Sequence, residues 1–238
     1  MFKRFGENFP DVRDIVKNVS FDFSNSNAIL DKPRPISHRF RFIGGVGLPK
    51  AKPVSSEFDK ILNVSKKGTV LFSFGTQVPP DRISPQLRNV FIDSFKSFPD
   101  FTFIWRYDGK TALNASNVYN VKWLPQTHLL YDERVVGFIS HMGQNSFIET
   151  SFAGVPVVSI PLFIDQVHNA RRADALGMGA IVPKTEITVE KLTSALAKIL
   201  NDPSYRIRAK EISSMLKTNP DNSIRNFIEG IEFAAQHK

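Results

Sequence analysis

The sequence of 238 residues contains no cysteine. This absence excludes disulfide bonds, thiolate nucleophiles and cysteine-ligated metals, and it leaves the redox compartment of the protein open. Long apolar runs are also missing, because no run reaches about 18 residues, the length that a membrane-spanning helix requires. The basic, Phe-containing start lacks the apolar core of a signal peptide. The chain as given is therefore expected to be soluble.

Blocks of like charge are absent as well, although the net charge is +8. The basic residues occur singly or in pairs such as Lys66-Lys67, and no zinc-ligand spacing or RNA-recognition signature accompanies them. We therefore expect no nucleic-acid partner and no bound metal. Tryptophan and tyrosine are scarce, with 2 and 4 residues, whereas phenylalanine is abundant with 21. The phenylalanines lie scattered in apolar runs, which favours a role in the core.

The first part of the chain differs from the rest. Residues 1–65 contain two short strand patterns, at 19–23 and around 40–43, separated and followed by proline- and glycine-rich stretches. This is too little regular structure for an independent domain. We interpret residues 1–65 as the tail of a preceding domain plus a linker, and residues 66–238 as a second domain.

Strand and helix patterns alternate from residue 66 onwards. Strands are predicted over 70–74, 101–107, 118–124, 135–140, 155–160 and 180–183. Helices are predicted over 84–98, about 145–152, about 166–176, 188–200, 204–217 and 222–236. This alternation predicts an α/β fold with a Rossmann-like parallel sheet covered by helices on both faces. The ligand site of such a sheet lies beyond the carboxyl ends of its strands.

The segment after the predicted strand 135–140 has the features of an anion site. His141 and Gly143 form the turn before a helix, whose first backbone N–H groups are unpaired and whose dipole is positive there. Asn145 and Ser146 are then able to cap the helix or donate to a phosphate. Taken alone, the motif favours the ordinary interpretation, in which Asn145 is only an N-cap and His141 a histidine at a strand end. Neither a dinucleotide glycine fingerprint nor a Walker loop occurs in the chain.

Other residues that follow predicted strands have similar double interpretations. Glu149 lies one helical turn after Asn145 and is suited to accept hydrogen bonds from a vicinal diol; otherwise it is a solvated glutamate. Trp123 offers a flat face to a base, or it is core. Asp165 is an N-cap or, together with the Gln166 amide, a ligand for sugar hydroxyls. The joint pattern is poorly explained by the ordinary interpretations alone.

Together these motifs resemble the signature of the UDP-glycosyltransferase family. The matching segments are Trp123-Leu-Pro-Gln126, His141-x-Gly143-x-Asn145-Ser146-x-x-Glu149, Ala153-Gly-Val-Pro156 and Pro161-x-x-x-Asp165-Gln166. Residues 70–76 and 103–109 are similar to the first strands of the family's C-terminal domain. Residues 21–47 are similar to the closing strand and linker of the animal, UDP-glucuronosyltransferase-like branch. The resemblance implies the C-terminal, donor-binding half of a GT-B glycosyltransferase.

The resemblance also assigns roles to individual residues. It implies that Trp123 stacks on uracil beside Gln126, and that Glu149 holds the ribose hydroxyls. The diphosphate is expected to contact His141, Asn145, Ser146, the backbone of Gly143 and Gln144, and the loop Ser73, Gly75, Thr76. Arg106, near the end of the predicted strand 101–107, completes the expected donor site, and Asp165 and Gln166 are expected to contact the sugar. Position 144 is Gln, whereas the plant pattern usually has tryptophan there; if only the backbone of this residue serves, donor binding is expected to survive.

The implied reaction is an inverting transfer from a UDP-sugar co-substrate to a small lipophilic acceptor, without metal or other cofactor. The family's catalytic base is a histidine of the N-terminal half, and no motif in this chain matches it, so no catalytic residue is expected here. Full-length members are anchored in the endoplasmic-reticulum membrane with this domain in the lumen. A non-catalytic subunit, a UDP-sugar epimerase, a homo-oligomer and a complementing N-terminal half stay open. So do the identities of the sugar and the acceptor.

Overall fold

A six-stranded parallel sheet forms the centre of the structure, a computed structural model that describes residues 6, 9–76, 78, 83–107 and 113–237. Its strands, in chain order, are β3 Thr69–Ser73, β4 Thr102–Arg106, β5 Val118–Val121, β6 Val135–Ser140, β7 Val157–Ser159 and β8 Gly179–Ile181. In space the order is β5-β4-β3-β6-β7-β8, and every neighbouring pair is parallel. The predicted α/β class is confirmed.

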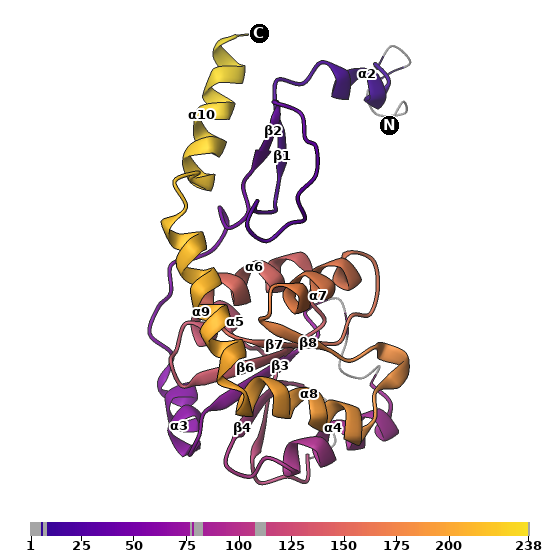
Figure 1. Cartoon of the computed structure of the whole chain (residues 1–238), viewed down its shortest axis with the longest axis vertical. Coiled ribbons are helices and arrows are strands. Elements are labelled where there is room, and N and C mark those ends of the chain that lie inside the picture. The colour runs from indigo at the N-terminus through magenta and orange to yellow at the C-terminus, as the bar shows by residue number, and fades with distance from the viewer. Residues whose placement is uncertain (1–5, 7–8, 77, 79–82, 108–112, 238) are drawn as a thin grey trace.

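Helices cover both faces of this sheet (Figure 1). Their bounds are α3 Ser56–Val64, α4 Pro85–Lys96, α5 Gln126–Leu130, α6 Gln144–Ala153, α7 Asp165–Ala175, α8 Val189–Asn201 and α9 Pro203–Thr218, with a 3₁₀ turn at Lys184–Glu186. Helices α4 and α8 pack on one face, and α3, α5, α6, α7 and α9 on the other. Because helices cover both faces of the sheet, side chains on both sides of the inner strands are buried, which explains why these strand sequences are largely apolar.

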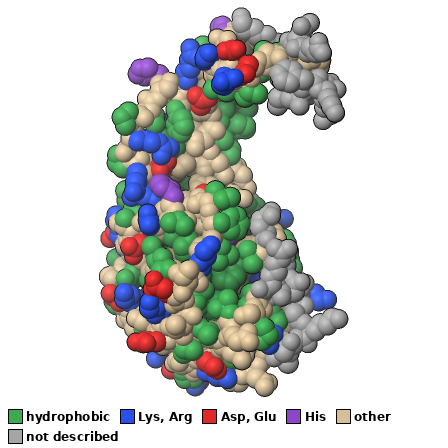
Figure 2. All heavy atoms as spheres, turned by 90° about the vertical axis from the view of Figure 1, so that its right-hand side faces the viewer, with side chains coloured by type: hydrophobic (Ala, Val, Ile, Leu, Met, Phe, Trp, Pro, Cys, Tyr) green, Lys and Arg blue, Asp and Glu red, His purple; other side chains and the backbone are tan. Residues whose placement is uncertain are grey.

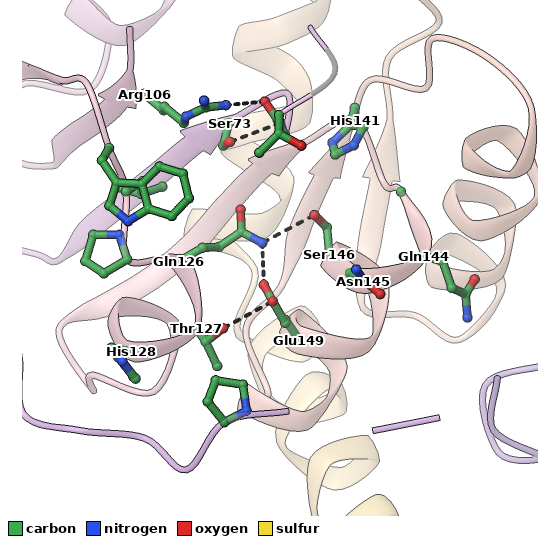
Figure 3. Close-up of a pocket in the computed structure, with 17 residues that line it drawn as sticks. Ser73, Arg106, Gln126, Thr127, His128, His141, Gln144, Asn145, Ser146 and Glu149 are labelled. Carbon is green, nitrogen blue, oxygen red and sulfur yellow. Dashed lines mark hydrogen bonds between the residues drawn. The ribbon is translucent and has the colours of Figure 1, made fainter. Parts of the chain in front are cut away.

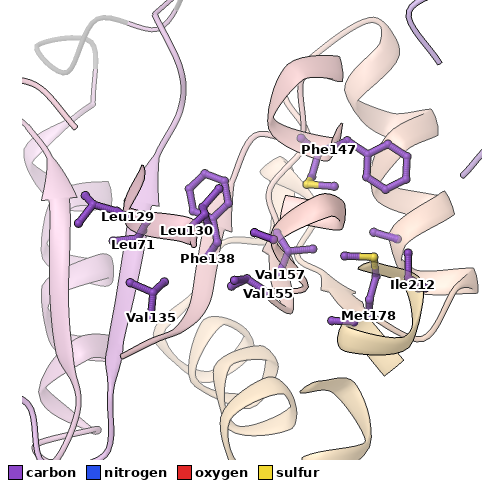
Figure 4. Close-up of a cluster of buried hydrophobic side chains, with 14 of the residues drawn as sticks. Leu71, Leu129, Leu130, Val135, Phe138, Phe147, Val155, Val157, Met178 and Ile212 are labelled. Carbon is purple, nitrogen blue, oxygen red and sulfur yellow. The ribbon is translucent and has the colours of Figure 1, made fainter. Parts of the chain in front are cut away.

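The side chains of β3 show how the strands feed two cores. Leu71 points to the core beneath α6 and α9, where it joins Phe138 and Ile212 (Figure 4), whereas Val70 and Phe72 point to the core beneath α4 and α8. This alternation follows from the two-residue period of a strand. The second core is rich in aromatic rings, including Phe72 stacked on Trp105 at 4.8 Å between ring centroids. The prediction that phenylalanines build the core is confirmed for these residues.

Several predicted element boundaries are wrong, for local reasons. The strand predicted over 155–160 begins at Val157, since Pro156 has no N–H to donate to the sheet. The strand predicted over 118–124 ends at Val121, which leaves Trp123 in the loop that follows. The strand predicted over 180–183 is β8, two residues earlier at its end. Helix α6 has Gly143 as its N-cap rather than Asn145.

The first and last segments of the chain form a separate aromatic body away from the central sheet (Figure 1). The strands β1 Asp22–Ser24 and β2 Phe40–Phe42 pair in parallel, after the short helix α2 Val12–Lys17. The C-terminal helix α10 Ser223–Gln236 packs against them. Phe23 lies 5.3 Å from Phe227 between ring centroids, and Phe21 lies 5.9 Å from Phe233. Strand β1 corresponds to the strand predicted over 19–23, and it begins and ends later than predicted, at Asp22–Ser24.

Charges of both signs are interspersed on the face of the molecule that Figure 2 shows. On the face shown there, Lys and Arg side chains alternate with Asp and Glu rather than gathering in one patch. In the described part of the chain no helix is long and apolar enough to cross a membrane. The part of the 103–109 motif at residues 108 and 109 lies outside the described residues.

Helix α3 was not predicted, because residues 1–65 were interpreted as tail and linker. Its Phe58 and Leu62 are nevertheless buried in the core beneath α6 and α9, and Leu62 is only 1% exposed. The domain boundary at residue 65 stays a prediction, but the segment just before it packs on the sheet.

Truncating Leu62 to alanine is expected to lower the free energy of unfolding by about 2–4 kcal/mol, because it opens a cavity in a packed core. Chemical denaturation measures this loss. Val64→Ala on the same helix is the control, since Val64 is 60% exposed and should change stability by less than about 0.5 kcal/mol. Equal effects of the two substitutions would contradict the packing of α3.

Candidate functional site

The topology places one large cavity at the carboxyl ends of the central strands. The chain runs from β3 outward to β4 and β5 and then returns to β6 on the other side of β3, so the strand order reverses between β3 and β6. Ligands bind at such switch points. The cavity has a volume of about 610 Å³ (Figure 3). Its lining consists of Pro49, Ser73, Gly75, Thr76, Arg106, Trp123, Leu124, Pro125, Gln126, Thr127, His128, His141, Gly143, Gln144, Asn145, Ser146 and Glu149.

The N-terminus of α6 opens into this cavity. Phe147 donates its N–H to the carbonyl of Gly143, which makes Gly143 the N-cap. The backbone N–H groups of Asn145 and Ser146 lie in the first turn, where a helix has no internal acceptor for them. The N–H of Gln144 donates to Oδ2 of Asp165 at 3.1 Å. Unpaired N–H groups and the positive end of the helix dipole together favour an anion here.

The His141 ring lies between two glycines. A Cβ built on Gly75 would lie 2.7 Å from Cε1 of the ring, and one built on Gly143 would lie 2.8 Å from Nε2. The ring is 9% exposed, and burial lowers the pKa of His141, while the charge of Asp165 opposes the shift. The imidazole is therefore neutral near pH 7 and has one N–H to donate. Among the described residues its Nδ1 is buried without a hydrogen-bond partner, so the N–H on Nε2 serves the cavity best.

The Glu149 carboxylate is held by two side chains from α5. Gln126 donates its Nε2 to Oε2, and Thr127 donates its hydroxyl to Oε1 at 3.1 Å (Figure 3). Burial raises the pKa of Glu149, and the two hydrogen bonds oppose that shift. An ionised carboxylate accepts about four hydrogen bonds, so two acceptor positions stay free after these contacts. They suit two neighbouring hydroxyl groups.

Trp123 and Arg106 form the outer wall of the cavity. Trp123 is 66% exposed, which is unusual for a tryptophan and leaves ring surface for a flat ligand. The Arg106 guanidinium lies 5.7 Å from the centre of that ring, within the range of a cation–π interaction. The same guanidinium donates to the carbonyl of Gly75. It thus ties the loop after β3 to the tryptophan.

Asp165 and Gln166 are the two predicted site residues that do not line this cavity. Asp165 is exposed and lies at its edge, where its Oδ2 also accepts from Nδ2 of Asn169 at 3.2 Å. Gln166 is 4% exposed, and its Oε1 accepts from the backbone N–H of Leu162 and Phe163. In this structure Gln166 therefore supports the turn that precedes α7.

Sequence reasoning missed Pro49, Thr127 and His128 among the lining residues. His128 accepts the N–H of Lys52 on Nδ1 at 3.3 Å, which leaves Nε2 as the protonated nitrogen. For Thr127 and His128 the available signal was their position directly after Gln126, because a helix that begins at Gln126 brings its first turn to the cavity. In the described part of the chain no three acidic or histidine side chains gather closely enough to hold a metal ion.

Fold and site together define a Rossmann-like α/β domain with a ligand cavity at its switch point, and solved glycosyltransferases share this fold. The spinosyn forosaminyltransferase SpnP superposes with a TM-score of 0.77 at 18% identity, covering 98% of this chain and 59% of that one. A UDP-glucose:anthocyanidin 3-O-glucosyltransferase, solved in complex with UDP, gives a TM-score of 0.73 at 22% identity over 90% of this chain and 53% of that one. These neighbours are GT-B glycosyltransferases.

Residues 7–238 match the family described as UDP-glucoronosyl and UDP-glucosyl transferase, and the chain belongs to that family. It is 36% identical over 229 residues to UDP-glucuronosyltransferase 1A4 of Oryctolagus cuniculus, which covers 94% of this chain and 42% of that protein. UDP-glucuronosyltransferase 1A5 of Homo sapiens is also 36% identical over 229 residues, with 95% and 42% covered. The chain thus spans about two-fifths of the length of these curated relatives. The family resemblance predicted from the motifs is confirmed.

Proposed function

We propose that this chain binds a UDP-sugar and holds it for transfer of the sugar to an acceptor hydroxyl. The observation that carries the proposal is that one cavity is lined by both an open helix N-terminus and a half-buried carboxylate with free acceptor positions. The first suits a diphosphate and the second a ribose. Family membership and relatives that are transferases favour transfer over epimerisation.

In the proposed complex the uracil stacks on Trp123 beside Gln126, and the ribose hydroxyls donate to Glu149. The diphosphate accepts hydrogen bonds from the N-terminus of α6, from His141 and from the loop that follows Ser73. When the bond to the sugar breaks, negative charge grows on this diphosphate, and the fixed donors then stabilise the transition state more than the substrate. The sugar is proposed to extend towards Asp165, at the edge of the cavity. Gln166 contributes either by supporting that turn or by turning its amide to the sugar.

Transfer further requires a base that deprotonates the acceptor. No motif of this chain matches the family's catalytic histidine, so we propose that the base and the pocket for a small lipophilic acceptor come from another part of the protein or from a complementing half. An inverting reaction follows if the acceptor attacks opposite the leaving diphosphate. Anchoring in the endoplasmic-reticulum membrane and self-association belong to the same family-level proposal.

Isothermal titration of this chain with UDP, uridine and a panel of UDP-sugars tests the donor site. We expect UDP to bind at least about tenfold, or 1.4 kcal/mol, more tightly than uridine, because uridine lacks the group that the α6 N-terminus attracts. ADP is the matched control for the base. If neither UDP nor any UDP-sugar binds, the proposed function is wrong.

A further inference from the structure

Asn25 joins the start of the chain to the anion-binding turn. It follows directly on β1, yet its Nδ2 donates to Oδ1 of Asn145 at 3.3 Å, across 120 positions of sequence. Its backbone carbonyl accepts Nε2 of Gln144 at 2.7 Å. The two contacts use different groups of Asn25, one on the side chain and one on the backbone. They meet the first two residues of α6.

The contact to Asn145 decides which end of that amide faces the cavity. An asparagine amide carries an acceptor oxygen and a donor nitrogen of nearly equal size, so only its hydrogen bonds fix the orientation. Because Asn25 donates to the oxygen, the nitrogen lies on the opposite side, towards Ser146 (Figure 3). Within the described residues no other side chain bonds the Asn145 amide. A diphosphate offers only acceptors, so the reversed amide would repel it.

The segment that carries Asn25 is itself held in place. Ile43 donates its N–H to the carbonyl of Ser24, and Gly44 donates to the carbonyl of Ser26. A few residues on, Asp31 is 8% exposed and pairs with Arg34 at 2.9 Å. Arg172 of α7 donates to the carbonyls of residues 30 and 31. The position of Asn25 is therefore fixed relative to α6 and α7.

We propose that Asn25 is a positioning residue of the donor site, which orients the Asn145 amide so that its nitrogen donates to the diphosphate. The same residue draws the Gln144 side chain away from the cavity, so that position 144 contributes its backbone alone. This inference rests on the proposed function. It adds a residue of the N-terminal segment to the proposed donor contacts, which otherwise come from the sheet domain.

A double-mutant cycle tests the proposal, with UDP and uridine titrated into wild type, Asn25→Ala, Asn145→Ala and the double variant. Alanine at position 25 keeps the carbonyl that Gln144 uses and removes only the donor to Asn145. We expect Asn25→Ala to weaken UDP binding about fivefold, as the loss of one oriented hydrogen bond does. Uridine affinity should stay unchanged. In the Asn145→Ala background the second substitution should have no further effect.

The matched control is Asn18→Ala, which removes an exposed asparagine side chain of the N-terminal segment whose one hydrogen bond among the described residues is to the carbonyl of Asp14. It should bind UDP like wild type. The inference is wrong if Asn25→Ala binds UDP as wild type does, if it weakens uridine equally, or if its effect persists without Asn145. A wild-type chain that fails to bind UDP instead overturns the proposed function, so the two failures are distinct.

Discussion

Replacing Glu149 by alanine should weaken UDP binding by about 100-fold. Each hydrogen bond to an ionised carboxylate contributes about 1.5–3 kcal/mol, and the proposed ribose contact contains two of them. The substitution also leaves the donors of Gln126 and Thr127 without their acceptor. Titration calorimetry measures the change, and Glu232→Ala, at an exposed position of α10, is the control.

The deoxyribose analogue separates ribose recognition from general damage to the site. Wild type should lose affinity for 2′-deoxy-UDP relative to UDP, because one of the two donors to Glu149 is missing. Glu149→Ala should bind the two nucleotides equally. If it still prefers UDP to the same degree as wild type, another residue holds the ribose and the proposed role of Glu149 is wrong.

The pH profile of binding gives an independent check on Glu149. Burial raises its pKa above the ordinary value of 4.5, so the carboxyl becomes protonated at a higher pH than a solvated glutamate does. Affinity should be full above that raised pKa and fall as the pH is lowered through it. A UDP-sugar is the right ligand, since the terminal phosphate of UDP itself titrates near pH 6. Glu149→Ala should lack this acid-side fall.

A single methyl group added at position 75 is expected to disrupt the donor site next to His141. Gly75 has a φ of +70°, and its Cβ would lie 2.7 Å from the His141 ring. Gly75→Ala should therefore cost about 1–2 kcal/mol of unfolding free energy from backbone strain, and it should displace the imidazole. We expect a loss of UDP affinity of at least about tenfold, because His141 and the loop after β3 then both move.

Two further glycine variants separate the effect of backbone strain from the effect of displacing the His141 ring. Gly143→Ala has no positive φ, but its Cβ would meet Nε2 of His141 at 2.8 Å, so binding should fall with little strain. Gly47→Ala places a Cβ where nothing lies within 4 Å, so it should change neither the UDP affinity nor the free energy of unfolding. Unchanged UDP binding in both Gly75→Ala and Gly143→Ala would show that the position of His141 is unimportant.

The sheet and most of the candidate site could be predicted because their signals are local. Buried strands are short apolar runs, and a helix that starts after β6 necessarily places Asn145 and Glu149 one turn apart. The same reasoning overextended β5 up to Trp123, because an aromatic residue extends an apolar pattern whether it is buried or exposed. Only the structure shows that this ring lies in a loop and faces solvent.

What could not be predicted depends on packing between distant segments. Helix α5 has five residues, which is too short for a periodic pattern, so the helix itself was not predicted and Thr127 was left out of the expected site. Helix α3 follows a proline-rich stretch that reads as linker, although the core buries Leu62. Gln166 fits the family motif, yet its burial against the turn before α7 follows from tertiary structure alone. The contact between Asn25 and Asn145 has no signature in spacing.

The aromatic body made of β1, β2 and α10 has a mechanical consequence. Helix α10, near the end of the chain, packs on β1 and β2, near its start. The body therefore closes a loop of about 180 residues that contains the whole central sheet. The entropic cost of closing a loop rises only slowly with its length. Two chain crossings, at 43–55 and 219–222, therefore join the body to the sheet. The segment between β1 and β2 adds a third link, because Asn25 contacts Asn145 and Arg172 of α7 donates to the carbonyls of residues 30 and 31, so the body is held against the donor side of the sheet at three places.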